Sequence, residues 1–208
     1  MQLSLTRFLL LSSFIFILSG CSSTYKDLQA TKGDITTIRK FKPNFKVALY
    51  KTQVFVTSHY LSGLLLVKTM PDSSIRMVFS NEMGLKFFDF EFLPDGSFKV
   101  FSIIKQMDKK PVITTLRKDF DLVLMRQLVP GSVLKDGHNI YYKFPQTKGF
   151  NYYITNLAGD TLLRMERASK RKPVVEAIMR DYHNGMPDTI GIEHKNFKFT
   201  ISLKRIEQ

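Results

Sequence analysis

Residues 86–102 are predicted to form two strands of one hairpin, because apolar and polar side chains alternate cleanly at 88–92. The first strand places aromatic and acidic side chains on opposite faces: Phe88, Phe90 and Phe92 on one, Asp89 and Glu91 on the other. This two-residue period is typical of a half-buried strand, so we expect buried rings and solvated carboxylates. A Pro-Asp-Gly triplet at 94–96 predicts a tight turn, and Phe98 begins the returning strand.

The same pattern recurs along most of the chain. We expect further strands over residues 45–49, 54–56, 60–70, 75–79, 140–144, 150–155, 161–167, 174–182, 190–192 and 197–203. A break at 51–53 would shift the inward face, and a short strand near 35–38 is a further candidate. The spacing in 174–182 suits helix or strand, and strand is chosen because hairpins flank it. Short turns between about ten or eleven strands predict an antiparallel meander that curls as it widens.

A helical period interrupts the strands after residue 110. Apolar residues then follow three-and-four spacing at Ile113, Leu116, Phe120, Val123, Leu124 and Leu128. Pro111 is acceptable in a first helical turn, where backbone donors are unpaired anyway. Leu122 and Met125 add apolar surface to neighbouring faces, so we expect an enclosed helix. The predicted fold is mainly β (α+β): an antiparallel, strongly curved, half-open β-barrel with this helix plugging its concave face.

An incompletely filled concave sheet would leave an apolar cavity suited to hydrophobic molecules. The candidate lining residues are Phe88, Phe90, Phe92, Phe98, Leu116, Phe120, Val123, Leu124, Phe199 and Ile201. The same residues would equally make an ordinary dry core, and periodicity alone favours that interpretation.

The N-terminus carries an export pattern. Arg7 precedes an eleven-residue apolar run at 8–18, which is too short to span a bilayer, and Leu-Ser-Gly-Cys follows at 18–21. These four residues resemble the lipobox of bacterial lipoproteins, so Cys21 is predicted to be lipidated. We expect a signal peptide at 1–20, a lipidated tether at 21–42 and a single domain at 43–208. Ser22 and Ser23 lack the acidic residue of an inner-membrane retention signal, which favours the outer membrane, facing the periplasm.

The 208-residue chain has a formal net charge of +13. Such a field favours an anionic partner, such as lipid headgroups or an acidic protein face. Export makes nucleic acid a poor candidate. A basic surface that only maintains solubility remains the alternative. Lys170, Arg171 and Lys172 form the densest basic loop and are candidate headgroup contacts.

The chain offers little for catalysis. The histidines are scattered without metal-ligand spacing, and there is no nucleophile elbow, phosphate loop or cysteine pair. Asp119 and Asp121 stand beside Arg117 and Lys118 on the predicted helix, where they would mark a solvent edge or form local ion pairs. We expect no enzyme activity, no cofactor and no metal.

The order of these features resembles the LolA/LolB-like superfamily. The resemblance rests on the lipobox, the basic tether, the run SGLLLVKTMPDSSIRMVFSNEMGLKFFDFEFLPDGSFKVF at 62–101, the inserted apolar helix and the closing Gly-Met-Pro-Asp-Thr-Ile at 185–190. It implies an open β-barrel plugged by helices, in which the LolB-type receptor accepts acyl chains of lipoproteins. Such receptors insert an apolar loop into the membrane; the corresponding connection here offers only Met83 and Leu85, and the tryptophans common in those receptors are absent.

The resulting hypothesis is an outer-membrane lipoprotein that binds an acyl chain, lipid or lipoprotein in an apolar cavity. Its mechanism would be partition of apolar chains out of water, with the helix moving aside. The alternative is an adaptor lipoprotein with a filled core that docks an envelope protein partner.

Overall fold

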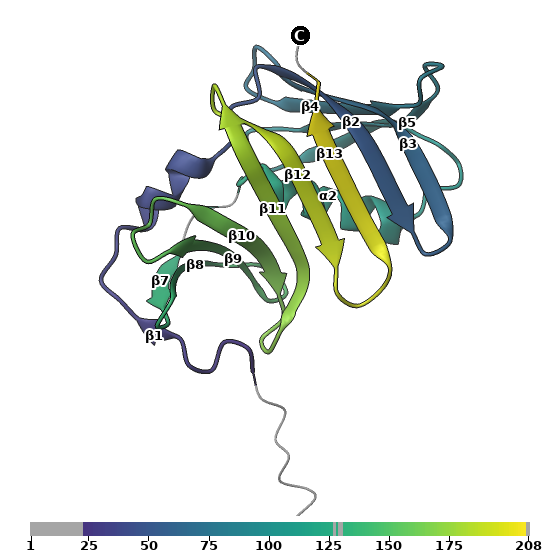
Figure 1. Cartoon of the computed structure of the whole chain (residues 1–208). Coiled ribbons are helices and arrows are strands. Elements are labelled where there is room, and N and C mark those ends of the chain that lie inside the picture. Colours follow the sequence, from purple (N-terminus) through teal and green to yellow (C-terminus); the bar gives the residue numbers. More distant parts are fainter. Residues whose placement is uncertain (1–22, 127, 129–130, 207–208) are drawn as a thin grey trace, which may run out of the picture.

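The computed structural model describes residues 23–126, 128 and 131–206, which form thirteen strands in one sheet, a 3-10 helix and an α-helix (Figure 1). In chain order these are β1 Gln29–Ala30, η2 Ile35–Phe41, β2 Val47–Val56, β3 His59–Thr69, β4 Ile75–Ser80, β5 Lys86–Phe92, β6 Phe98–Ile103, α2 Lys110–Val123, β7 Ser132–Lys135, β8 Asn139–Pro145, β9 Phe150–Asn156, β10 Leu162–Ala168, β11 Pro173–His183, β12 Met186–His194 and β13 Phe199–Arg205. The mainly β prediction is confirmed, including a strand rather than a helix at β11.

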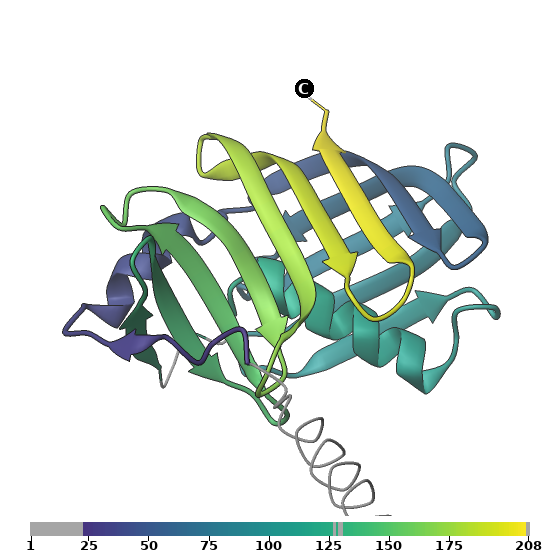
Figure 2. The same ribbon diagram turned by 60° about the horizontal axis from the view of Figure 1, so that its bottom comes forward.

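The sheet is antiparallel throughout and follows the order β1-β7-β8-β9-β10-β11-β12-β13-β2-β3-β4-β5-β6. β1 and β6 are its two edges, so the sheet curves without closing, and α2 crosses its concave side (Figure 2). The half-open architecture with a helix on the concave face is therefore confirmed. Because neighbouring strands are antiparallel, successive turns alternate between the two ends of the strands.

Helix α2 begins with a proline in its first turn, as the sequence predicts, and ends at Val123. The helix is shorter than the apolar spacing predicts, because Leu124 caps it and Met125 takes a positive φ of 49°. The helix is amphipathic rather than apolar all round: Leu116 and Phe120 are buried, whereas Thr114 and Lys118 face solvent. It therefore covers the sheet and also presents a polar face.

The core lies between the concave face and α2. Phe88, Phe90 and Phe92 point into it from β5, as predicted. β2 corrects the expected break at 51–53: it runs unbroken against β3, and its inward residues are Ala48, Tyr50, Thr52 and Val54. Alanine and threonine carry weak hydrophobic signals, so the true alternation was hidden.

The segment before β2 is closer to the sheet than a tether would be. Tyr25 stacks on Tyr152 of β9 with ring centroids 4.4 Å apart. β1 pairs with β7, and these two unpredicted short strands raise the count above the expected number. Residues 35–41 form η2 instead of a strand, with Ile38 fully buried. Its start is capped by Asp34, whose carboxylate accepts from the backbone of Thr36.

The carboxylates of β5 correct the expected solvated face. They point to the convex side as predicted, yet Asp89 is 3% and Glu91 8% exposed. Arg76 on β4 donates two hydrogen bonds to Asp89, and Ser74 donates one to Glu91. Long neighbouring side chains bury the acids because cross-strand partners on a convex face lie within reach of one another.

Gly63 lets β3 and β4 approach closely where the sheet bends. A Cβ atom at this position would lie 2.0 Å from the backbone oxygen of Ser80. No side chain fits there, so close backbone contact requires a glycine at this position.

Candidate functional site

The ten residues predicted to line a cavity do converge beneath α2. All belong to one apolar cluster, nine of them buried and Phe98 partly buried. Phe120 of α2 contacts the rings of Phe88 and Phe92, with centroids 5.9 and 6.4 Å away. Phe199 and Ile201 of β13 are buried in the same cluster, and Ile201 lines one void together with Phe88 and Phe120.

These side chains fill most of the space that they enclose. The apolar void among them measures about 20 Å³ and is lined by Thr52, Val54, Leu61, Leu65, Phe79, Phe88, Met107, Leu116, Phe120 and Ile201. About 10–15 Å³ suffices for one water, whereas small-molecule sites measure roughly 300–1,000 Å³. Among the described residues that line this void, the interior is packed, and an acyl chain fits at this place only if α2 moves.

A buried ionic cluster ties α2 to the sheet, which sequence reasoning missed. Asp119 is 0% exposed and lies between two strands. Arg167 of β10 donates to Oδ1 of Asp119, and Nε2 of His194, at the end of β12, contacts Oδ2 of Asp119. Both distances are 2.8 Å. An ionised carboxylate only accepts, so the imidazole donates from Nε2. The expected solvent-edge position of Asp119 is therefore wrong.

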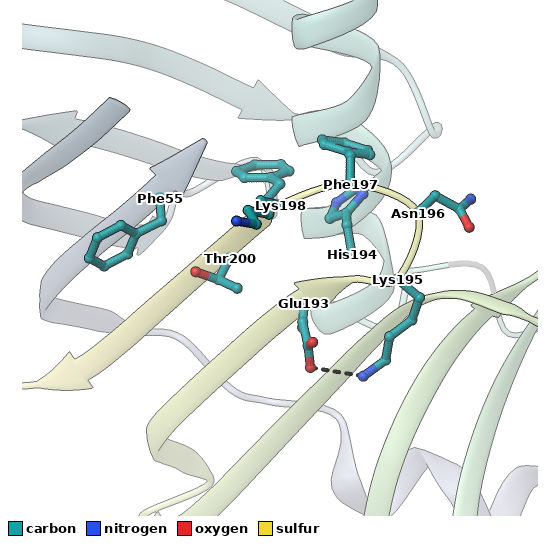
Figure 3. Close-up of a pocket in the computed structure, with 9 residues that line it drawn as sticks. Phe55, Glu193, His194, Lys195, Asn196, Phe197, Lys198 and Thr200 are labelled. Carbon is teal, nitrogen blue, oxygen red and sulfur yellow. Dashed lines mark hydrogen bonds and ion pairs between the residues drawn. The ribbon is translucent and has the colours of Figure 1, made fainter. Parts of the chain in front are cut away.

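His194 also shapes the β12–β13 turn. Its ring packs against Phe197 and Phe199, each 4.7 Å away between centroids. Figure 3 shows the His194 and Phe197 rings together, while Glu193 and Lys195 pair on the other side of the turn at 2.8 Å. A shallow depression of about 370 Å³ extends from here to Phe55. Its open form suits contact with a surface rather than enclosure of a small molecule.

A larger cleft occupies the seam between the two halves of the unclosed sheet. It measures about 520 Å³ and lies among the polar face of α2, the start of β6 and the β8–β9 turn. Its lining residues are Phe98, Ile113, Thr114, Arg117, Lys118, Asp121, Pro145, Gln146, Thr147, Lys148, Asn151 and Arg167. Burial raises the pKa of Asp121 against the opposing effect of Arg126 and Arg117. We call this space the seam cleft.

The two ends of the strands carry opposite charge. Turns 57–58, 81–85, 146–149, 169–172 and 195–198 lie at one end, here called the basic edge, with six Lys or Arg residues and one acid, Glu82. Turns 70–74, 93–97, 136–138, 157–161 and 184–185 lie at the other end and carry Asp72, Asp95, Asp136 and Asp160 without a lysine or arginine. The hydroxyl and backbone N–H of Ser97 hold the pKa of Asp95 below its usual value, which keeps this acid ionised. The turns at the two ends of the strands thus differ in the sign of their charge.

The chain enters the domain at the basic edge. The backbone N–H of Thr24 donates to the carbonyl of Arg171 at 2.8 Å, and the Ser23 hydroxyl donates to the same carbonyl at 3.2 Å. Lys170, Arg171 and Lys172 form the β10–β11 turn beside it. Cys21 lies outside the described residues, two positions before Ser23.

Exposed apolar side chains gather at the same edge. Met83 is 89% and Leu85 58% exposed in the β4–β5 turn, where the sequence placed candidate membrane contacts. Phe55 is 52% exposed and lies against Tyr60, with ring centroids 4.6 Å apart. Phe197 in the β12–β13 turn is 47% exposed. Apolar and aromatic side chains interspersed with lysines are typical of surfaces that rest at a membrane interface.

The described residues contain no candidate metal site and no candidate membrane-spanning helix. No group of three or more His, Cys, Asp or Glu side chains there is placed to hold a metal ion. None of the described helices has the length and apolar character needed to cross a bilayer.

Comparison with known proteins gave structural similarity only. No family model matches the chain, and no curated protein matches it. Among solved structures, a LolA superfamily protein from Nitrosomonas europaea aligns at 9% identity and a TM-score of 0.49, over 83% of this chain and 90% of the other. A DUF1329 family protein from Desulfovibrio piger aligns at 9% identity and 0.46, over 83% and 88%.

A third solved structure, described as a putative outer membrane lipoprotein-sorting protein domain from Vibrio parahaemolyticus, aligns at 7% identity and a TM-score of 0.41, over 83% and 89%. The fold described above rests on strand order, register and the position of α2. The solved structures to which the chain is similar thus include a member of the superfamily that its sequence resembles.

Proposed function

We propose that this protein is a non-enzymatic, lipid-anchored protein of the bacterial outer membrane that binds the acyl part of an amphiphile between α2 and the concave sheet. One observation carries the proposal: a single helix separates the apolar interior from the seam cleft. Leu116 and Phe120 line the void on one side of α2, and Ile113 and Arg117 line the cleft on the other. Displacing this one element would join the two spaces.

The forces on α2 suit a hinged cover. Phe120 and its neighbours hold it by apolar contact, which an acyl chain could replace at roughly 25 cal/mol per Å² buried. The directional contacts among the described residues are Asp119 with Arg167 and His194, the Tyr153 hydroxyl with the carbonyl of Leu122 at 3.2 Å, and Arg117 with the carbonyl of Gly96 at 3.0 Å. A chain entering beneath the helix therefore exchanges one apolar contact for another, and its main cost is the separation of these polar contacts, above all the buried Asp119 cluster.

The basic edge sets the orientation in this proposal. Lipidated Cys21 would hold the β10–β11 turn at the bilayer, and the positive edge would face anionic headgroups while the acidic edge points away. Met83 and Phe55 would then reach the interface. The β8–β9 turn of this edge lines one side of the seam cleft, and Phe98, which follows the acidic turn at 93–97, lines the other.

Native mass spectrometry of residues 22–208, purified without detergent and mixed with 1-monooleoyl glycerol, tests acyl binding. We expect a one-to-one adduct, formed more readily by Asp119→Asn because this variant releases α2 from β10 and β12 and populates the open state. Asp108→Asn is the matched control: it makes the same charge change in the exposed loop before α2. An adduct in neither protein, or equal gains in both variants, would contradict binding beneath the helix.

The packed interior favours a second function, an adaptor with a filled core. This alternative predicts no adduct with any acyl probe and a specific protein crosslinked to the domain in intact membranes. The void of about 20 Å³ is the observation on its side. The mass spectrometry result separates the two functions.

A further inference from the structure

We propose that the seam cleft binds the phosphate-bearing headgroup of an anionic amphiphile, an inference that names the ligand class and rests on the proposed function. The cleft measures about 520 Å³, within the range of roughly 300–1,000 Å³ found for small-molecule sites. It is far larger than the void beneath α2, so a headgroup fits without any movement of the fold.

Two side-chain amides in the cleft each have one buried atom without a hydrogen-bond partner among the described residues. Asn151 on β9 is 4% exposed, and its Oδ1 has no hydrogen-bond partner among the described residues; Nε2 of Gln146, in the β8–β9 turn, is also buried and unpartnered there. Buried polar atoms are almost always hydrogen-bonded in native proteins. One free acceptor and one free donor in the same cleft suit a ligand with both groups, such as a phosphate ester carrying a hydroxyl.

The charges of the cleft favour an anion. Arg117, Lys118, Lys148 and Arg167 line it, against the single carboxylate of Asp121. Asp121 lies 3.7 Å from both Arg117 and Arg126, and Arg167 pairs with Asp119. Lys118 and Lys148 take part in no ion pair within residues 23–126, 128 and 131–206, and both are exposed at the cleft. Their ammonium groups are free to bind phosphate oxygens by charge-assisted hydrogen bonds.

An apolar path leads from the cleft into the core. Phe98 lines the cleft and packs against Phe90 and Phe92, with ring centroids 5.1 and 5.0 Å away. Ile113 lines the cleft three residues before Leu116, which lines the void. A headgroup held by Lys118 and Asn151 would therefore direct its acyl chain beneath α2. A free phosphate ion shares the headgroup chemistry and lacks the chain, so the two sources are separable.

Calorimetric titration of residues 22–208 at low salt tests the site with three probes: dihexanoyl phosphatidylglycerol, dihexanoyl phosphatidylcholine and inorganic phosphate. These residues include every strand and helix that the structure describes, together with the core, so the domain is expected to fold as a unit. Two variants remove cleft groups, Asn151→Val and the pair Lys118→Gln and Lys148→Gln. The control, Lys51→Gln with Lys204→Gln, changes the same charge on exposed strand positions outside the cleft.

We expect the anionic lipid to bind about tenfold more tightly than the zwitterionic lipid of equal chain length. Both cleft variants should lose this preference for the anionic lipid, and the control should keep it. Asn151→Val should keep the melting temperature, since it removes an unpartnered polar atom, so its loss of binding reports the ligand. If inorganic phosphate binds as tightly as the anionic lipid and the same variants lose this binding, the anion site is supported and its ligand is free phosphate. Equal binding of both lipids overturns the headgroup site and leaves acyl binding intact; binding of no probe overturns both proposals.

Discussion

The buried carboxylate of Asp119 offers a direct measure of how α2 is held. Asp119→Asn keeps the shape of the side chain and removes its charge, which leaves Arg167 without a counter-ion and makes His194 compete for one remaining acceptor. Removing one partner from a buried ion pair costs about 3–5 kcal/mol. Arg167 keeps a side-chain exposure of 16% toward the cleft, so water compensates in part. We therefore expect a loss near the lower limit, about 3 kcal/mol.

That loss converts to a melting temperature about 6–12 °C lower, at about 2–4 °C per kcal/mol for a domain of this size. Thermal unfolding followed by circular dichroism at pH 7 measures it, with Asp108→Asn expected within about 2 °C of wild type because that side chain is exposed. A second comparison isolates the interaction. The double variant Asp119→Leu with Arg167→Met should lose less stability than the sum of its single substitutions, because no buried charge remains unpaired.

Two results would refute this reasoning. A melting temperature for Asp119→Asn within about 2 °C of wild type would mean that the cluster is hydrated and holds nothing. Additive losses in the double variant would mean that Asp119 and Arg167 do not interact, despite the 2.8 Å contact.

Three further predictions concern the sheet and its edges. Burial opposes ionisation of Asp89, but its contacts with Arg76 and Lys86 outweigh burial and hold its pKa below the usual value. The stabilisation from these contacts is therefore lost as the pH falls through that lowered pKa. In urea unfolding, Asp89→Asn should lower stability by about 1–3 kcal/mol at pH 7, and a difference between variant and wild type that is undiminished near pH 2 would contradict this. Replacing Lys170, Arg171 and Lys172 with glutamine should lower the affinity for phosphatidylglycerol-containing vesicles about 100-fold in a sedimentation assay at low salt, at about 1 kcal/mol per charge. An equal loss of affinity after the same change at Lys51, Lys68 and Lys204 would refute a specific role of the basic edge in membrane binding. Gly63→Ala should lower the free energy of unfolding in urea by about 3 kcal/mol or more, because its Cβ would clash with a backbone oxygen. Gly137→Ala, with open space around it, should lower stability little, and similar losses of stability in both variants would contradict the close approach at Gly63.

Local pattern predicts most of the fold of this chain. Alternation places Phe88, Phe90 and Phe92 on the inner face, and the Pro-Asp-Gly triplet closes the hairpin with Gly96 at a φ of 87°. Alternate turns of an antiparallel meander lie at the same end, so even the two charged edges follow from turn composition once the strand order is known. The prediction is weaker where side chains are small: Ala48 and Thr52 point inward on β2 without a hydrophobic signal.

Long-range contacts decide the rest. The sequence determines that residues 110–123 form a helix and which side chains are apolar, because helix and strand periods depend on neighbours a few positions away. It does not determine that Asp119 is buried, since its partners Arg167 and His194 are 48 and 75 positions later in the chain. Only the tertiary structure brings them together, leaves a void of about 20 Å³ beneath α2 and forms the seam cleft among α2, β6 and the β8–β9 turn, because volume and charge pairing depend on how the whole sheet curves.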